Sequence, residues 1–190
     1  SMFAGLYIPL TLALLALILR AVSIEYRGKS HSQTARNLWT WAMAGGSFVA
    51  AFTIGAMLAL TTTGLPLNEY GDRVGGPFAW FNGWAVLGGL AVVGISLAQG
   101  WAFLSLKTLG APRLAGNRQL RRYLPLYFLP AATWAILVVM RYPKVPSWGM
   151  LTVAAVGLVV AWGASSRRKE GLTFTGMVVF IVFGVGAIFT

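Results

Sequence analysis

Six long runs of apolar residues, separated by short segments that carry nearly all of the charge, dominate this sequence. A helix needs about 20 mostly apolar residues to cross about 30 Å of hydrocarbon. We therefore expect six membrane spans, at residues 3–24, 38–61, 84–106, 124–140, 148–164 and 172–190. The predicted fold class is all-α, a polytopic transmembrane helix bundle that forms a single transmembrane domain over residues 1–190.

Composition agrees with a membrane protein and narrows its chemistry. Hydrophobic residues make up 57% of the chain and charged residues 10%, whereas a soluble domain has about 25% charged residues. The net charge of +11 would suggest nucleic acid in a soluble protein, but here the basic residues lie between apolar runs. We predict no nucleic-acid partner. With no cysteine and one histidine, His31 in a polar loop, we also predict no metal site in this chain.

The segments between the runs alternate in charge. Basic residues gather in the first, third and fifth segments, whereas Glu69 and Asp72 lie in the second. The basic residues are Arg27, Lys29 and Arg36 in the first, Lys107, Arg113, Arg118, Arg121 and Arg122 in the third, and Arg167, Arg168 and Lys169 in the fifth. The positive-inside rule places these segments in the cytoplasm. The same charges can also hold anionic lipid, although topology alone accounts for them.

Small residues recur every four positions in two of the runs, a pattern that lets helices approach closely. They are Ala42, Gly46 and Ala50 with Ala51, Gly55 and Ala59 in the second run, and Gly157, Ala161 and Ser165 in the fifth. Both ends of the sequence adjoin an apolar run. We therefore expect the chain to be a fragment of a longer protein.

The clearest functional hint is Arg20, which lies near the end of the first apolar run. A charged group at membrane depth costs a few kcal/mol or more unless it is paired or reaches water. Arg20 either extends its guanidinium to the headgroups or contacts another helix or subunit. Glu25 lies nearly opposite on the same helix and has the favourable four-residue spacing to Lys29. Arg27 shares the face of Arg20, two turns on.

Catalytic patterns are absent from this sequence. There is no phosphate-binding loop of the Walker type, and no run contains two carboxylates. We therefore predict no catalytic residue in this chain. Gln99, the clearest polar residue of the third run, either bonds a neighbouring helix or lines a hydrated path. From the residues alone, a multi-pass secondary transporter or channel and a purely structural scaffold are alternative interpretations; a transporter would bring polar residues together at mid-membrane.

A resemblance to a known family is carried by residues 19–29. They read Leu-Arg-Ala-Val-Ser-Ile-Glu-Tyr-Arg-Gly-Lys and resemble the Leu-Arg-x-Val-x-(Phe/Ile)-Glu-(Phe/Trp)-Arg-Gly-Lys signature of subunit II of cytochrome bd ubiquinol or menaquinol oxidase. Further points of resemblance are residues 5–10, 64–67, Asn82 with 87–90, and 106–108. Beyond Thr108 the likeness is mainly one of hydropathy and order.

The resemblance implies a place and a function for the chain. Family members have about nine helices, and these six are similar to the third to eighth. The family complex lies in the bacterial cytoplasmic membrane, reduces dioxygen to water with quinol electrons, and takes protons from the cytoplasm, which builds a proton gradient. Subunit I holds two haems b, one haem d and the quinol-oxidising loop. Subunit II is haem-free and supports it; some members bind a structural quinone, and a small single-helix accessory subunit is compatible with this assembly.

The resemblance also assigns roles to residues of the signature. It favours Arg20 and Glu25 as proton-route or subunit-interface residues, and Gln99 is a further candidate because it is polar within a span. A carboxylate at the cytoplasmic mouth, such as Glu25, can collect and relay protons. Arg27 is predicted to anchor the helix end at the headgroups.

Overall fold

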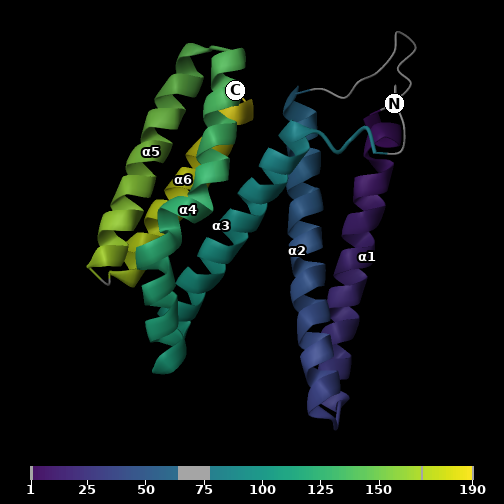
Figure 1. Cartoon of the computed structure of the whole chain (residues 1–190). Coiled ribbons are helices and arrows are strands. Elements are labelled where there is room, and N and C mark those ends of the chain that lie inside the picture. Colours follow the sequence, from purple (N-terminus) through teal and green to yellow (C-terminus); the bar gives the residue numbers. More distant parts are fainter. Residues whose placement is uncertain (1, 64–77, 168, 190) are drawn as a thin grey trace. The chain divides into compact units, whose positions relative to one another are not determined.

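The computed structural model describes residues 2–63, 78–167 and 169–189, with side chains from Leu6 onward. This part of the chain is almost entirely helical and contains no strand (Figure 1). The helices are α1 (Met2–Lys29), α2 (Gln33–Thr63), α3 (Gly83–Lys107), α4 (Ala111–Arg141), α5 (Val145–Ser166) and α6 (Glu170–Phe189). Each is long and apolar enough to cross a membrane, which confirms the predicted fold class. Residues 64–67, Glu69, Asp72 and Arg168 lie outside the described residues.

Two compact units divide the chain, Ser1–Val93 and Gly94–Thr190. The first contains α1, α2 and the beginning of α3, and the second contains the rest of α3 and the three helices that follow. Each unit is described by itself below. The single transmembrane domain that the sequence indicates stays a prediction.

The predicted loop at 107–123 is wrong over most of its length, because α4 begins at Ala111. Gly110 precedes the helix with a φ of 73°, in the left-handed region that favours glycine. Pro112 follows in the first turn, where a missing N–H is tolerated. Hydropathy detects only the part of a helix that suits hydrocarbon, so the polar beginning of α4 was read as a loop. The apolar run at 124–140 had suggested a short fourth helix, but α4 extends from Ala111 to Arg141.

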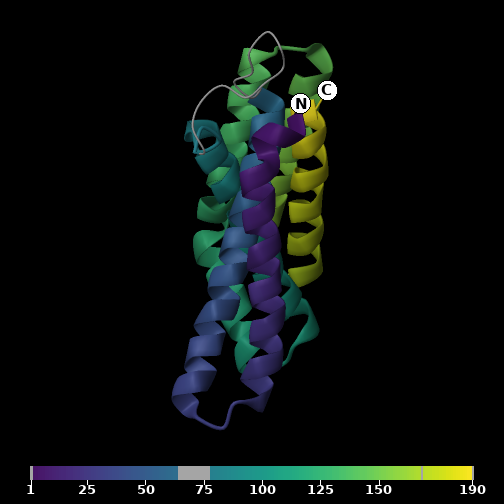
Figure 2. The same ribbon diagram turned by 90° about the vertical axis from the view of Figure 1, so that its right-hand side faces the viewer.

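In the first unit, glycines set the distance between helices. A Cβ on Gly46 of α2 would lie 2.8 Å from the carbonyl oxygen of Ala16 in α1 and 3.3 Å from the amide nitrogen of Arg20. The two helices form a closely packed pair (Figure 2). Gly55 of α2 meets the backbone of Gly88 in α3 in the same way. Both small-residue patterns of the second run therefore pack against a neighbouring helix, as predicted.

A small apolar cluster closes the α2–α3 end of the first unit. It consists of buried Ala56, Leu60, Trp80 and Ala85, with Leu6 and Ile8 of α1 packed against it. Asn82 caps α3, because its side-chain oxygen accepts a hydrogen bond of 2.9 Å from the amide of Ala85. The segment before α3 thus packs against α1 and α2 through Trp80, and Asn82 joins it to α3.

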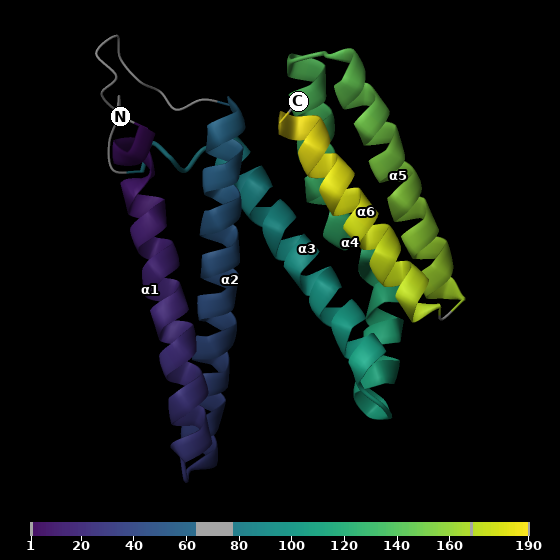
Figure 3. The same ribbon diagram turned by 180° about the vertical axis from the view of Figure 1, so that it is seen from behind.

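The second unit is built on the α5–α6 pair, against which α4 packs (Figure 3). A Cβ on Gly176 of α6 would lie 2.7 Å from the carbonyl oxygen of Gly157 and 2.9 Å from the Cβ of Ala161. This contact confirms the packing role predicted for the small residues of the fifth run. The rings of Phe128 in α4 and Phe180 in α6 meet edge to face, with centroids 4.9 Å apart.

The glycine contact between α5 and α6 predicts a position-specific effect of a larger side chain. Gly176→Leu should destabilise the protein by about 1–3 kcal/mol, because the added atoms meet backbone that cannot move aside. The measurement is the thermal unfolding midpoint of the detergent-solubilised protein. Gly163→Leu on α5 is the matched control, since a Cβ there meets nothing within 4 Å. Equal midpoints for the two variants would contradict this account of the packing.

Candidate functional site

Arg20 lies on an uncovered apolar surface of α1. Its side chain is exposed, and so are those of Leu17, Ile18, Leu19 and Val22 around it. Its backbone packs against Gly46, but within the described ranges its guanidinium has no hydrogen-bond or ion-pair partner. The structure therefore leaves a charged group on a surface that is otherwise suited to lipid or to another apolar protein surface.

Helix geometry bears on the two alternatives for Arg20. The predicted span ends at residue 24, four positions after Arg20, which is about 6 Å along the helix axis. A long side chain such as arginine can extend over a distance of that order to reach the headgroups. Extension to the headgroups and contact with another subunit therefore both stay predictions.

Glu25 forms an ion pair with Lys29, as its four-residue spacing predicts. Both side chains are largely exposed, at 64% and 71%, so solvent screening leaves the pair weak. The carboxylate of Glu25 therefore remains accessible at the end of α1.

Arg27 connects the end of α1 to α2. Its Nε donates a hydrogen bond of 3.0 Å to the hydroxyl of Thr40, which itself donates to the carbonyl oxygen of Arg36. Beside this contact the rings of Tyr26 and Trp39 stack with centroids 5.3 Å apart. Arg27 thus fixes the helix pair, and its anchoring at the headgroups stays a prediction.

Gln99 belongs to the second unit, whereas Arg20 and Glu25 belong to the first. Its side chain is half-buried in α3, and its Oε1 is buried with no hydrogen-bond partner in the described part of the chain. A bond from this oxygen to a neighbouring helix is therefore not formed among the described residues. Both roles suggested for Gln99 stay predictions.

One polar cluster was missed by the sequence analysis. Arg113 in α4 makes two hydrogen bonds to Glu170 in α6, at 2.7 and 3.0 Å, and Asn117 donates to the same carboxylate at 2.7 Å. The side chain of Glu170 is only 11% exposed. The partners are 57 residues apart, so no local pattern reveals them. The signal available in the sequence is the acid Glu170 directly after the basic residues Arg167, Arg168 and Lys169.

The described residues offer no group of three His, Cys, Asp or Glu side chains that could hold a metal ion. His31 is exposed between α1 and α2.

Comparison with known proteins decides the family. A family model described as cytochrome bd terminal oxidase subunit II matches residues 1–190. The chain belongs to this family. The match confirms the resemblance carried by residues 19–29 and extends it beyond Thr108.

Individual relatives agree with this membership. The chain is 25% identical to cytochrome bd ubiquinol oxidase subunit 2 of Bacillus subtilis over 194 residues, which cover 100% of this chain and 57% of the relative. It is 34% identical to cytochrome bd-I ubiquinol oxidase subunit 2 of Escherichia coli over 112 residues, or 57% of this chain and 30% of the relative. A probable cytochrome oxidase subunit 2 of Haemophilus influenzae is 35% identical over 115 residues, 58% of this chain and 30% of the relative. The chain thus spans little more than half the length of the Bacillus protein.

The Arg113–Glu170 pair predicts a non-additive pair of substitutions. Arg113→Met and Glu170→Gln should each lower the thermal midpoint of the solubilised protein by a few degrees, since each leaves a polar partner without its bond. The thermal midpoint of the double variant should be at least as high as that of the less stable single variant. Additive losses would show that the pair contributes nothing as a pair.

Proposed function

We propose that this chain is part of the haem-free subunit II of a bd-type terminal quinol oxidase, which reduces dioxygen to water with electrons from quinol. The observation that carries the proposal is the match of the subunit II family over residues 1–190. The six apolar helices agree with a multi-pass protein of the bacterial cytoplasmic membrane. Nothing in the comparisons supports the alternative of a secondary transporter or channel.

In this proposal the redox chemistry belongs to the partner subunit I. That subunit holds two haems b, one haem d and the quinol site, while this chain supports it. The exposed position of His31, the only histidine, supports this division. Protons taken up from the cytoplasm for water formation build the proton gradient. A structural quinone and a small single-helix accessory subunit are compatible with the same assembly.

Arg20 and Glu25 receive different roles. Arg20 meets a polar group of subunit I, because the apolar side chains around it on α1 are exposed and its guanidinium has no partner among the described residues. Glu25 collects protons at the cytoplasmic end of α1, where its exposed ion pair with Lys29 is weak enough to open. Gln99 is a further proton-route candidate through its unpartnered Oε1.

The proposal is tested on the complex that purifies with the full-length subunit. A reduced-minus-oxidised absorbance spectrum should show haem b and haem d bands, and the preparation should consume oxygen when quinol is added. A colourless preparation without quinol-dependent oxygen uptake would overturn the proposed function.

The interface role predicts that Arg20→Leu impairs assembly. A partner group that loses its charged neighbour within the membrane is left unpaired, so the haem that co-purifies with the subunit should fall several-fold. Arg36→Leu removes an equal charge from an exposed position in the first turn of α2 and should leave the haem content unchanged. Wild-type haem content and oxygen uptake in the Arg20 variant would exclude the role.

A further inference from the structure

Three arginines at the beginning of α4 have no carboxylate partner in the described part of the chain. Arg118, Arg121 and Arg122 are all exposed. The acids among the described residues are Glu25 and Glu170, and they already pair with Lys29 and Arg113. Arg118 and Arg122 are four residues apart, so their like charges repel across one helical turn. The beginning of α4 therefore carries positive charge that no described acid neutralises.

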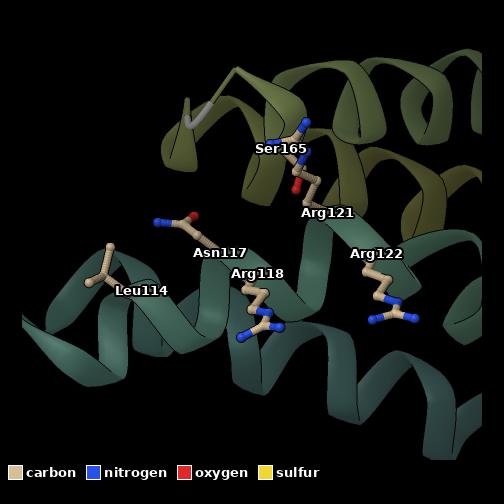
Figure 4. Close-up of a pocket in the computed structure, with 6 residues that line it drawn as sticks. All are labelled: Leu114, Asn117, Arg118, Arg121, Arg122 and Ser165. Carbon is tan, nitrogen blue, oxygen red and sulfur yellow. The ribbon is translucent and has the colours of Figure 1, made fainter.

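These arginines line a hollow between α4 and the end of α5 (Figure 4). Its volume is about 530 Å³. The lining residues are Leu114, Asn117, Arg118, Arg121, Arg122 and Ser165. In Figure 4 the side chain of Arg121 extends from α4 towards Ser165, whereas Arg118 and Arg122 project on the other side of the helix. Basic groups thus reach the hollow from α4, and a hydroxyl reaches it from α5.

Ser165 supplies the observation that points to a ligand. The residue is 3% exposed, and its buried hydroxyl has no hydrogen-bond partner within the described residues. By contrast, the buried hydroxyls of Ser23 and Ser105 donate to carbonyls of their own helices, Ser23 to Leu19 at 2.6 Å and Ser105 to Ala102 at 2.8 Å. The hydroxyl of Ser165 remains available as a donor beside guanidinium groups, which can only donate. A ligand for this set of groups must be anionic and must accept hydrogen bonds.

The position of the hollow along the helices favours a lipid as the source of that anion. Arg122 lies just before residue 124, where the fourth apolar run begins, and Ser165 lies just after residue 164, where the fifth ends. The guanidinium of Arg122 lies 5.3 Å from the ring centre of Tyr123, and aromatic rings concentrate at the membrane interface. The hollow therefore lies at the level of the lipid headgroups.

We propose that the hollow between α4 and α5 binds the phosphodiester of an anionic phospholipid, held by Arg121 and by the hydroxyl of Ser165, while Arg118 and Arg122 on the other side of α4 add positive charge nearby. Arginine suits this ligand because its planar fork matches phosphate oxygens. Asn117, which also lines the hollow, is already engaged by Glu170, and the charge of that acid is balanced by Arg113. The bound lipid would lie in the space between α4 and α5 and offset part of the positive charge at the beginning of α4. The proposal does not depend on the oxidase reaction.

The test uses the intact complex with the full-length subunit, reconstituted in nanodiscs of phosphatidylcholine with a minor fraction of phosphatidylglycerol. Native mass spectrometry after detergent release counts the phosphatidylglycerol molecules retained. Arg118→Gln with Arg121→Gln should weaken retention about thirtyfold, and Ser165→Ala should weaken it about tenfold. The matched control, Arg36→Gln with Arg141→Gln, removes the same charge from two exposed positions that do not line the hollow.

Two further measurements separate the outcomes. Wild-type haem content in the Ser165 variant shows that its loss of lipid is not a loss of fold. Equal retention in all variants, or the same loss in the control, would overturn the proposal.

A lipid-free preparation titrated with inorganic phosphate tests whether the hollow binds free phosphate instead of a lipid phosphodiester. Saturable phosphate binding that needs Ser165, together with unchanged lipid retention, would also overturn the lipid assignment.

Discussion

Close approach of helix backbones is the constraint on which this structure depends. Lipid tails are as apolar as leucine, so burial of apolar surface does not drive helices together within a membrane. Contact must come from short-range packing, and a glycine allows more of it than a larger residue. Gly46, Gly55 and Gly176 each lie where a Cβ would meet the backbone or Cβ of a neighbouring helix. Many large apolar side chains are exposed, as on α1, whereas others such as Phe128 and Phe180 fill the space between helices.

The same constraint explains what could be predicted from the sequence. The four-residue period of the small residues correctly identified the helix faces around Gly46 and Gly157, because small residues let helix backbones approach closely in a membrane. The spacing of Glu25 and Lys29 identified their ion pair, because a local pair depends only on helix geometry. Hydropathy found the six helices but missed the beginning of α4, where arginines and Asn117 extend the helix beyond the apolar run.

Long-range polar contacts could not be predicted in this way. Arg113 meets Glu170 only because α4 and α6 pack in one unit, and a sequence pattern does not contain that packing. Ser165 had been predicted to be one of the small packing residues, and its side chain is indeed buried near the end of α5. Its hydroxyl has no hydrogen-bond partner in the described part of the chain, and a single sequence does not reveal that. For Arg20 the sequence supplied the depth in the span, and the structure added the uncovered surface around it.

The two helix pairs have a consequence for how the protein is made. In α1–α2 and in α5–α6 the contacting residues are close in the chain, and only residues 30–32 separate α1 from α2. Contacts between near neighbours need little chain closure and form quickly. Each pair can therefore assemble as soon as its second helix has left the ribosome and entered the bilayer. The contact between α4 and α6 reaches past α5, so it forms after α5 and α6 have entered the bilayer.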